Sequence, residues 1–425
     1  MRFDSNKILI FILIFLFNSN IFSQSLDSTI VEKYGQLKVD GNKIVNQFGQ
    51  PISLRGMSLF WSQWMGQYYN SNSVKWLKDD WKCTVVRAAM GIESGGYLTN
   101  SVTEKNKIIK VIDACIEEGI YVIVDWHDHH AQDHQTEAIK FFKEIATLYG
   151  DEPNIIYEIF NEPEQVSWAN VVKPYSEAVI SEIRAIDSNN IILVGSPTWS
   201  QDVDIAASNP VNFTNIEYSL HFYAATHKQF LRNKAKVALA KGVALFVSEF
   251  GTCESTGSGV LDYEEMNTWF AFMEENNLSW CNWSIADKVE TSAALKPGAS
   301  GNGGWSDLQI TDSGKLIKDK IISLNTITDV EYENKINNKL NNSIQNYPNP
   351  FNQSTNVKFI LNKAGRVKIN IFNMLGENIL DVVDKDFPKG EFSLNVNFKD
   401  LPSGNYFLSF NSENETKILK IQLMK

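Results

Sequence analysis

Cysteine is scarce in this sequence: four occur among 425 residues, and no two of them form a CxxC pair. So small a number excludes a disulfide-stapled scaffold, and the missing pair argues against a structural zinc ribbon. Cys83 and Cys281 lie in apolar runs, where a thiol usually packs as a small hydrophobe. The spacing leaves open whether Cys83, Cys115, Cys253 and Cys281 pair with one another.

Positive charge is also in short supply. Lys and Arg number 39 against 50 Asp and Glu, a net charge of −11, which argues against a nucleic-acid-binding protein because such a protein needs a basic surface. Hydrophobic residues make up 43% of the chain, which is enough for a large core and excludes global disorder. At roughly 100–200 residues per domain, the length predicts two or three domains.

Long hydrophobic runs are absent after the first residues of the chain. The one early run, Ile8–Phe17, is too short for a membrane-spanning helix, which needs about 20 residues. Arg2 and Lys7 precede this run, and the small residue Ser23 follows it, an arrangement typical of an export signal. We therefore predict a signal peptide over residues 1–23 and a secreted protein, extracellular or at the cell surface, without stable membrane insertion.

Short β-branched runs alternate with longer amphipathic stretches between about residues 50 and 325. This alternation predicts parallel strands joined by helical crossovers, and its length fits a (β/α)₈ TIM barrel. No GxGxxG turn follows the first strand, which argues against a doubly wound nucleotide-binding sheet. The predicted strands are Ile52–Gly56, Thr84–Ala88, Ile120–Asp125, Ile155–Phe160, Ile191–Val194, Tyr218–Phe222, Ala244–Glu249 and Ser279–Asn282.

The remaining residues change in character. Residues 327–345 are polar and lack apolar periodicity, which indicates a linker. Residues 346–425 contain short alternating runs separated by Gly, Pro and Asn, a pattern that predicts a small all-β sandwich. The predicted fold class is therefore α/β for a barrel over residues 24–326, followed by this sandwich.

Polar and aromatic residues stand near the ends of the predicted barrel strands. Catalytic groups of TIM barrels lie at the carboxyl ends of their strands, and a buried charge is costly unless it is paired. A purely structural barrel has no need of such groups at these positions. They are Arg87, Asp125, His127, Asn161, Glu162, His221, Tyr223, Glu249 and Trp283.

Glu162 and Glu249 follow the fourth and seventh predicted strands. Two carboxylates facing one glycosidic bond are what its hydrolysis requires, although a glutamate is more often a surface residue. All eleven tryptophans lie between Trp61 and Trp305, and flat aromatic rings bind the apolar faces of sugars. The tryptophans therefore favour the catalytic interpretation.

Two runs of sequence resemble glycoside hydrolase family 5 and, in detail, its bacterial endoglucanase (cellulase) subfamily. They are Ile159-Phe160-Asn161-Glu162-Pro163 and Val247-Ser248-Glu249-Phe250-Gly251-Thr252. Further matching stretches follow in the order of the family: Arg55–Ser58, Val86–Met90, Val124–His127, Thr198–Val203 and Asn282–Leu295.

The resemblance implies an endo-β-1,4-glucanase that retains the anomeric configuration, with β-glucan polysaccharide as its substrate and no cofactor. Glu162 would be the general acid/base and Glu249 the nucleophile, with about 5–5.5 Å between the two carboxyl groups. Other residues would support the reacting centre, namely Arg87, His127, Asn161, His221 and Tyr223. The remaining residues would bind sugars: Trp283 at the centre, Trp64, Lys288 and Glu290 on the donor side, and Trp199 on the acceptor side.

Two positions depart from the family pattern. Phe60 stands where many relatives have a histidine, and Gly91 stands where an aromatic residue often follows. Both belong to distal subsites, so mannan, xyloglucan or mixed-linkage glucan remain alternative substrates. A non-catalytic glycan-binding barrel is an alternative of another class, but it would be expected to lack one of the two glutamates.

Four of the six histidines lie between His127 and His134, beside Asp125, Asp128 and Asp133. Imidazoles and carboxylates in one stretch suggest a metal site. Against it, the stretch has no HExxH spacing, and the adjacent His129 and His130 would point apart on any regular element. We therefore predict that no metal is bound.

The C-terminal region resembles a type IX secretion sorting domain. The matching runs are Asn346–Asn352, Ile371–Gly376, Leu401–Phe407 and the basic, apolar end Lys417–Lys425. The resemblance implies that outer-membrane secretion machinery is a partner of this region. A carbohydrate-binding module is the alternative, but the region contains no tryptophan for a flat cellulose-binding surface.

Overall fold

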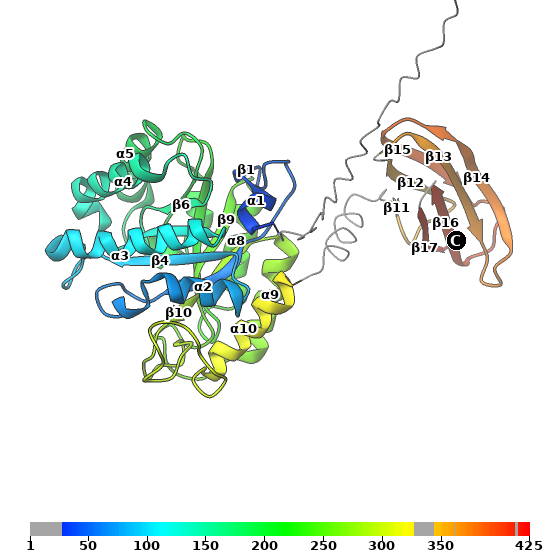
Figure 1. Cartoon of the computed structure of the whole chain (residues 1–425). Helices are drawn as coiled ribbons and strands as arrows, with labels where there is room; N and C mark the ends of the chain where they lie inside the picture. The colour runs from blue at the N-terminus through cyan, green and yellow to red at the C-terminus, as the bar shows by residue number, and fades with distance from the viewer. Residues whose placement is uncertain (1–27, 327–343, 362, 413–414) are drawn as a thin grey trace, which may run out of the picture. The chain divides into compact units, whose positions relative to one another are not determined.

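The structure is a computed structural model that describes residues 28–326, 344–361, 363–412 and 415–425. The chain divides into two compact units, Met1–Asn325 and Thr326–Lys425 (Figure 1). The predicted signal peptide, residues 1–23, and residues 327–343 of the predicted linker lie outside the described residues.

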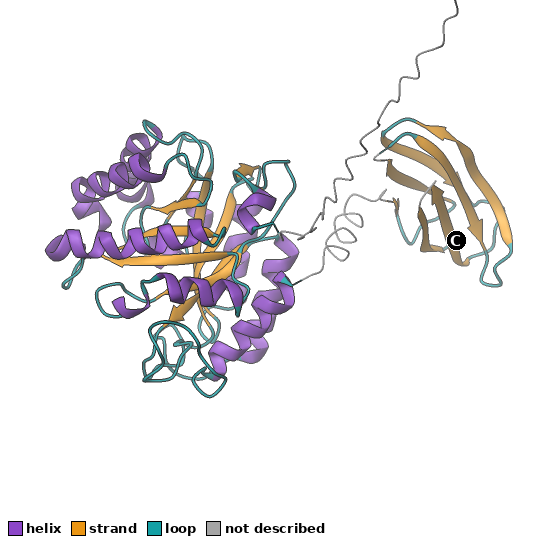
Figure 2. Cartoon of the chain, viewed as in Figure 1, coloured by secondary structure: helices purple, strands orange, loops and turns teal. Residues whose placement is uncertain are grey.

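Eight parallel strands in the described part of the first unit close into a barrel, in the order β10-β3-β4-β5-β6-β7-β8-β9. The predicted (β/α)₈ barrel is thus confirmed, with helices around the strands (Figure 2). The strands are β3 (Arg55–Leu59), β4 (Val85–Gly91), β5 (Tyr121–His127), β6 (Ile155–Glu158), β7 (Ile191–Val194), β8 (Ile216–Tyr223), β9 (Ala244–Gly251) and β10 (Ser279–Ile285). The helices of the barrel are α2 (Ser71–Asp79), α3 (Tyr97–Glu117), α4 (Gln135–Tyr149), α5 (Lys173–Arg184), α6 (Pro197–Ser200), α7 (Val203–Ala206), α8 (Gln229–Ala240), α9 (Tyr263–Asn276) and α10 (Asp312–Asn325), with the short turns η1 (Gly66–Tyr68), η2 (Ala131–His134) and η3 (Trp168–Val172).

Side chains alternate along each barrel strand between the interior and the helices. In β5, Trp126 packs in the core that the helices share with the outside of the barrel, whereas Tyr121 and Ile123 belong to the cluster inside its lower half. Asp125 and His127 continue the interior row towards the carboxyl end. The interior therefore changes from apolar at the bottom to polar at the top, and this gradient places the site.

The N-terminal segment closes the bottom of the barrel. It consists of α1 (Ile30–Tyr34) and a hairpin of β1 (Lys38–Asp40) and β2 (Lys43–Val45). Ile52 and Leu54 join the interior cluster, and the first barrel strand begins only at Arg55. The predicted strand Ile52–Gly56 was therefore placed too early, because its apolar residues fill the floor of the barrel.

Other element boundaries also differ from the prediction. β6 ends at Glu158, so Asn161 and Glu162 lie beyond the strand that was expected to continue to Phe160. The helical stretch between β6 and β7 begins with the π turn η3, and α5 starts at Lys173 with a proline in its first turn, where a missing N–H costs little.

The second unit is an all-β sandwich, as predicted. It has a three-stranded antiparallel sheet, β11-β12-β15, and a four-stranded one, β14-β13-β16-β17, which enclose a core of their own. β14 lies at the edge of the four-stranded sheet, and it combines exposed charged residues with half-buried aliphatic ones. The strands are β11 (Ile344–Tyr347), β12 (Ser354–Leu361), β13 (Gly365–Phe372), β14 (Asn378–Phe387), β15 (Gly390–Asn397), β16 (Gly404–Ser412) and β17 (Glu415–Leu423).

Two further findings concern the described residues. All four cysteines lie among them, and each is buried with a free thiol. No helix in the described ranges combines the length and apolar character needed to cross a membrane.

Candidate active site

The structure brings Glu162 and Glu249 into one cavity at the carboxyl ends of the barrel strands. One carboxylate oxygen of each and one ring nitrogen of His221 lie within 4.8 Å of one another. The central part of the cavity, about 210 Å³, is also lined by Trp283, Lys288 and Glu290. Residues from distant parts of the sequence thus converge on one small volume.

Arg87 lies behind this cavity and joins several of its groups. Its side chain is fully buried in β4, and its Nη1 donates to Glu249 Oε2 at 2.9 Å. Its Nε donates to Glu158 Oε2 at 2.7 Å, and its Nη2 lies 3.0 Å from Asp125 Oδ2. One guanidinium therefore compensates three buried carboxylates from three other strands.

Glu158 and His221 form a second connected group. Ser248 Oγ and Ser219 Oγ donate to Glu158 Oε1 at 2.5 and 2.7 Å. Burial opposes the charged form of Glu158, but Arg87 and His221 outweigh it and lower the pKa of Glu158 to about 2. Although burial alone would lower the pKa of His221, the Glu158 carboxylate 3.7 Å from its Nε2 and its hydrogen bond to Glu162 raise the pKa to about 9.

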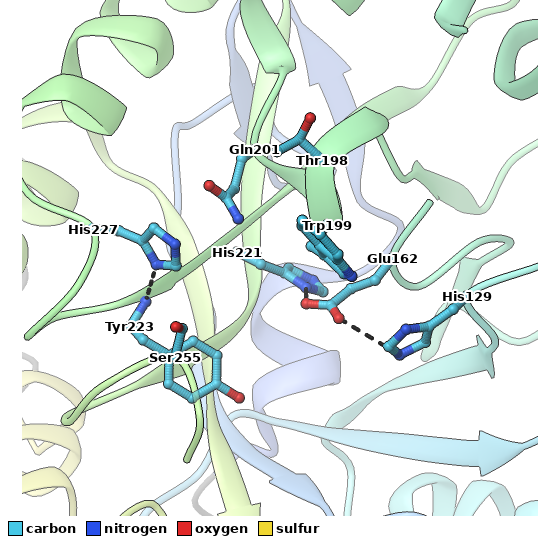
Figure 3. Close-up of a pocket in the computed structure, with 9 residues that line it drawn as sticks. All are labelled: His129, Glu162, Thr198, Trp199, Gln201, His221, Tyr223, His227 and Ser255. Carbon is cyan, nitrogen blue, oxygen red and sulfur yellow. Dashed lines mark hydrogen bonds and ion pairs between the residues drawn. The ribbon is translucent and has the colours of Figure 1, made fainter. Parts of the chain in front are cut away.

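The charged ring of His221 has a partner on each side. Nδ1 donates to Glu162 Oε1 at 2.9 Å, and Nε2 donates to Ser248 Oγ at 2.9 Å. Figure 3 shows Glu162 between His221 and His129, whose Nε2 is 3.7 Å from Glu162 Oε2. Glu162 therefore lies beside the cationic ring of His221, whose other nitrogen is held by Ser248.

Glu249 reaches the cavity because β9 contains a bulge. Ser219 of β8 pairs with Phe246, and His221, two residues on, pairs with Glu249, so β9 carries one residue more. The same shift occurs against β10. A bulge of this kind re-aims side chains, and here the adjacent Ser248 and Glu249 both contact groups of the interior.

Tyr223 holds the other oxygen of Glu249, since its hydroxyl donates to Oε1 at 3.0 Å. Burial raises the pKa of Glu249, and the nearby Glu162 carboxylate adds to the effect, while His221, Arg87 and Tyr223 oppose it. Two carboxylates this close favour a state in which one proton is shared between them.

His127 is neutral and has a defined tautomer. Burial and the nearby Arg87 hold the pKa of His127 well below its usual value. Its Nδ1 donates to Asp125 Oδ2 at 2.7 Å, which leaves Nε2 as an acceptor. The ring stacks on Trp283 at 5.0 Å with an interplanar angle of 4°, so the two rings form one continuous surface.

Asn161 is oriented by Arg87. Its Oδ1 accepts a hydrogen bond from Arg87 Nη2 at 2.6 Å. Its Nδ2 is buried and has no hydrogen-bond partner among the described groups. A buried donor without a partner costs free energy, so this amide is available to bind a ligand.

The three residues predicted to bind the donor-side sugar lie in the loops after β3 and β10. Trp64 is 54% exposed. Lys288 pairs with Glu290, and its Nζ lies 4.6 Å from the centre of the Phe60 ring. The Lys288 ammonium group therefore makes a cation–π contact with Phe60.

A further cavity, of about 470 Å³, is lined by Trp199, Gln201, His227 and Ser255 together with Glu162 (Figure 3). His227 Nδ1 accepts a hydrogen bond from the Tyr223 backbone N–H at 2.8 Å. Burial lowers the pKa of His227 to about 4. Its ring is therefore neutral, with Nε2–H left to donate.

Trp199 stands in an unusual left-handed turn. Thr198, Trp199 and Ser200 have φ angles of 58°, 55° and 56°, a conformation that costs about 1–2 kcal/mol per residue. The turn is held in place by hydrogen bonds from Trp199 N to Pro163 O at 2.8 Å and from Ser200 Oγ to Asn161 O at 2.7 Å. The loop that carries Trp199 is thereby attached to the loop that carries Glu162.

Two groups in the described part of the chain have carboxylate and imidazole atoms close enough to hold a metal ion. One is Glu162, His221 and Glu249, and the other is Glu93, Asp128 and His134. His129 and His130 point to different carboxylates: His129 approaches Glu162, and His130 lies near Glu93 and Glu164. The absence of a bound metal stays a prediction.

Sequence reasoning missed several residues of this site. Glu158 was not singled out, although a glutamate within the apolar run of β6 was a usable signal. Ser248 faces the interior because of the bulge, and no residue type in the sequence indicates that bulge. Loop residues also line the cavities, and the sequence pattern does not indicate where a side chain in a loop points. They are Trp61, His129, His227, Gln201 and Ser255.

Comparisons with known proteins agree on both units. Residues 45–289 match the family model described as cellulase (glycosyl hydrolase family 5). Residues 345–424 match the model of a secretion system C-terminal sorting domain.

The curated relatives are longer than the matched part. An endoglucanase of Clostridium saccharobutylicum is 48% identical over 69% of this chain and 66% of its own length. Endoglucanase Z of Dickeya dadantii is 49% identical over 68% of this chain and 66% of its own length. This chain thus spans just under two thirds of each.

Solved structures match the first unit. One from Cytophaga hutchinsonii has a TM-score of 0.70 at 57% identity and covers 70% of this chain and 98% of its own. The catalytic domain of Thermobifida fusca endoglucanase Cel5A in complex with cellotetraose has a TM-score of 0.67 at 35% identity, over 69% of this chain and 99% of its own. The resemblance seen in the sequence is confirmed, and the chain belongs to glycoside hydrolase family 5.

Proposed function

We propose that this protein is an exported endo-β-1,4-glucanase that hydrolyses internal bonds of cellulose or related β-glucans with retention of configuration. The observation that carries this proposal is the pair Glu162 and Glu249, whose oxygens lie within 4.8 Å of one another in one cavity. Retaining glycosidases place their carboxyl groups about 5–5.5 Å apart, whereas inverting ones leave about 6.5–9.5 Å for a water molecule. The relatives named endoglucanases support glucan as the polymer.

In the first step, Glu249 attacks the anomeric carbon, and Glu162 donates its proton to the departing glycosidic oxygen. Protonation of Glu162 removes the negative charge that helps to raise the pKa of Glu249. Arg87 and Tyr223 then hold Glu249 as an anion aimed at the sugar. The bond from the anomeric carbon to the leaving oxygen breaks as the glycosyl–enzyme ester forms.

In the second step, Glu162 acts as the base. It takes a proton from a water molecule, whose oxygen attacks the anomeric carbon and releases Glu249. His221 donates a hydrogen bond to Glu162 Oε1 throughout and stabilises its anionic form between the two steps. The same residue thus serves as acid and then as base.

The remaining predicted residues bind sugar. Asn161 offers its unpartnered Nδ2–H to the 2-hydroxyl of the reacting sugar, and this bond strengthens in the transition state. His127 and Trp283 present their joint ring surface to the same sugar. The next donor sugar contacts Trp64, Lys288 and Glu290, and the acceptor sugar lies on Trp199.

The experiment that tests this proposal is the release of reducing ends from carboxymethylcellulose by the purified protein, with β-mannan in parallel and a chelator present. Release from the cellulose derivative is expected, and it should fall to a small fraction in Glu162→Gln and in Glu249→Gln while both variants stay folded. Activity on mannan alone would leave the proposed mechanism in place but would make mannan the substrate. If either variant stayed folded and kept near-normal turnover, the glutamate that it replaces would not have the proposed catalytic role.

The sorting domain match extends the proposal to export. We infer that the type IX machinery recognises residues 346–425 and carries the enzyme out of the cell. Deleting these residues in a host with that machinery is expected to leave the active enzyme inside the cell envelope. Unchanged appearance in the medium would contradict the inference.

A further inference from the structure

A group of possible metal ligands lies apart from the catalytic pair, where the loops after β4 and β5 meet. One carboxylate oxygen of Glu93, one of Asp128 and one ring nitrogen of His134 lie within 4.8 Å of one another. Glu93 follows the end of β4, whereas Asp128 and His134 follow the end of β5. Neither Glu162 nor Glu249 belongs to this group, and the proposed mechanism makes no use of it.

His134 is oriented in the way that metal-binding histidines usually are. Its Nδ1 donates to Asp128 Oδ2 at 2.8 Å, since a carboxylate can only accept, and this tautomer leaves Nε2 with a lone pair. Asp128 is fixed in turn, because Trp126 Nε1 donates to Oδ2 at 3.2 Å and the His130 N–H donates to Oδ1 at 2.9 Å. A carboxylate on the far nitrogen fixes the ring of a metal-binding histidine and raises its basicity.

Glu93 lies opposite the free nitrogen of His134. Its Oε1 is 3.8 Å from His134 Nε2 and 3.6 Å from His130 Nδ1, and both distances are too long for a hydrogen bond. Two ligands that each lie about 2.0–2.1 Å from a tetrahedral zinc ion are about 3.4 Å apart. Each pair is therefore slightly wider than the separation that an ion between them needs.

An ion can reach this group from the solvent. The side chain of Glu93 is exposed and that of His134 is partly exposed, whereas Asp128 is buried. Glu93, Asp128 and His130 also line a cavity of about 190 Å³. Water molecules can therefore complete the coordination of an ion while the carboxylate that orients His134 stays dry.

The catalytic group of Glu162, His221 and Glu249 has similar spacing but offers no ligand nitrogen. Both ring nitrogens of His221 donate hydrogen bonds, so the charged ring has no lone pair for a metal. Glu249 is in addition paired with Arg87. Of these two groups in the described part of the chain, the one at His134 is therefore the better metal site.

Sequence spacing did not reveal this group, because Glu93 belongs to a different loop from the four histidines between His127 and His134. The donor set also indicates the kind of ion. Imidazole nitrogen with carboxylate oxygen suits zinc and its neighbours in the first transition row. Calcium and magnesium prefer oxygen ligands alone.

We propose that Glu93, His134 and His130 bind one zinc-like divalent ion and that Asp128 is the positioning residue that orients His134. The ion joins the loop after β4 to the loop after β5. The second of these loops supports the acid/base, because the Glu162 N–H donates to Asp128 O at 3.3 Å. The proposal replaces, for this group alone, the sequence prediction that no metal is bound, and it leaves hydrolysis to the two glutamates.

The test is isothermal titration calorimetry of zinc chloride into the purified, chelator-treated protein. One ion per chain is expected to bind. Asp128→Asn keeps the shape of the side chain and removes its charge, and it should weaken zinc binding about 10–100-fold, the usual effect of losing the partner of a ligand histidine. Glu93→Gln removes a ligand and should weaken binding by at least as much.

A matched control and a second readout make the result specific. Asp133→Asn removes a charge from the same loop but outside the group, so it should leave zinc binding unchanged. Copper(II) binds the same kinds of ligand more tightly than zinc, and its electron paramagnetic resonance spectrum should show coupling to imidazole nitrogen that is lost in His134→Gln.

Stability gives a third readout, which does not depend on Asp128. Zinc should raise the unfolding temperature of the wild-type protein, because an ion that binds the folded chain stabilises it. It should not do so in Glu93→Gln. Since Glu93 is exposed, this variant is expected to fold, and it decides the question if Asp128→Asn does not.

Zinc binding that requires both Glu93 and His134 supports the proposal. Binding that is lost in Glu249→Gln instead would overturn it, because the ion would then lie in the catalytic cavity. An equal loss in Asp133→Asn, or no saturable binding, would also overturn it. Hydrolysis of carboxymethylcellulose is measured separately, so an active enzyme that binds no zinc contradicts only this proposal, and an inactive one that binds zinc contradicts only the proposed function.

Discussion

Glu249 and Glu162 reach the same cavity from different kinds of backbone. Glu249 belongs to β9, its side chain is 6% exposed, and its oxygens accept hydrogen bonds from Arg87 and Tyr223. Glu162 lies beyond the end of β6, its side chain is 14% exposed, and its neighbours are His221 and His129. The loop of Glu162 is attached to the left-handed turn of Trp199.

The difference corresponds to the two proposed roles. A nucleophile has to keep one position and one charge, and strand backbone with fixed donors provides both. An acid/base has to exchange its proton with substrate and water, and a more open position on a loop permits this. We therefore expect changes around Glu249 to affect the fold as well as the chemistry, and changes around Glu162 to affect mainly the chemistry.

The largest expected effect separates the two glutamates by their need for acid catalysis. Glu162→Ala should lose about 10²–10⁴-fold on cellulose derivatives, the usual contribution of a general acid/base. An aryl cellobioside with an activated leaving group needs no proton, so this variant should still release a burst of phenolate in stopped-flow experiments. Glu249→Ala should give no phenolate burst with the aryl cellobioside and should be inactive on cellulose derivatives.

Azide is the control for this prediction. A small anion can replace water in the second step without a base, so it should restore turnover of the activated substrate in Glu162→Ala and yield a β-glycosyl azide. A burst from Glu249→Ala, or no rescue of Glu162→Ala, would reverse or cancel the assignment.

Arg87→Met should have the next largest effect, on stability. It leaves Glu158 and Asp125 buried without their cation, and removing one partner of a buried ion pair typically costs about 3–5 kcal/mol of unfolding free energy. Urea denaturation measures the change. Lys288→Met is the matched control, because its pair with Glu290 is partly exposed and is worth about 0–1 kcal/mol; equal losses in the two variants would contradict the comparison.

His221 predicts a pH dependence of stability. The Glu158 and Glu162 carboxylates beside its ring raise its pKa to about 9 in the folded state, against about 6.5 in an unfolded chain. The folded protein therefore gains stability from this group below pH 6.5, and it loses that gain as the pH rises from 6.5 to 9. The loss should approach about 3 kcal/mol.

Denaturation curves between pH 6 and pH 10 measure this loss. The wild-type protein should lose stability across the stated window, and His221→Gln should lose less. If the two proteins showed parallel pH profiles, His221 would not carry a charge in the folded state.

Trp199 gives the smallest expected effect, on the side of Glu162. Both Trp199→Ala and Trp199→Gly remove the indole and should weaken acceptor binding equally. Glycine adopts the φ of 55° found at this position without strain, so Trp199→Gly should be more stable than Trp199→Ala by about 1 kcal/mol. Thermal unfolding of the two variants measures the difference, and a less stable glycine variant would show that the turn is not strained at this residue.

The barrel and the positions of most site residues could be predicted from the sequence because side chains alternate between two faces along a strand. A polar residue that interrupts an apolar run near the end of a strand, such as Arg87 or His221, is expected to lie in the interior or at the top of the barrel. Glu249 was placed by the same argument. The alternation of apolar strands and amphipathic helices supplied the fold class.

What could not be predicted depends on departures from regular backbone. The left-handed turn at Thr198–Ser200 contains no glycine or asparagine that would announce it. The strand β3 was placed too early because Ile52 and Leu54 are apolar for another reason, namely to close the floor of the barrel.

The bulge in β9 has a consequence for how this gene can change. Because one additional residue lets both Ser248 and Glu249 face inward, the length of the strand is itself a constraint, apart from the residues in it. Loss of a single codon between those for Phe246 and Glu249 would restore regular pairing and rotate either the serine or the glutamate away from its partners. Descendants of this gene are therefore free to exchange residues along β9 far more readily than to lose or gain one there.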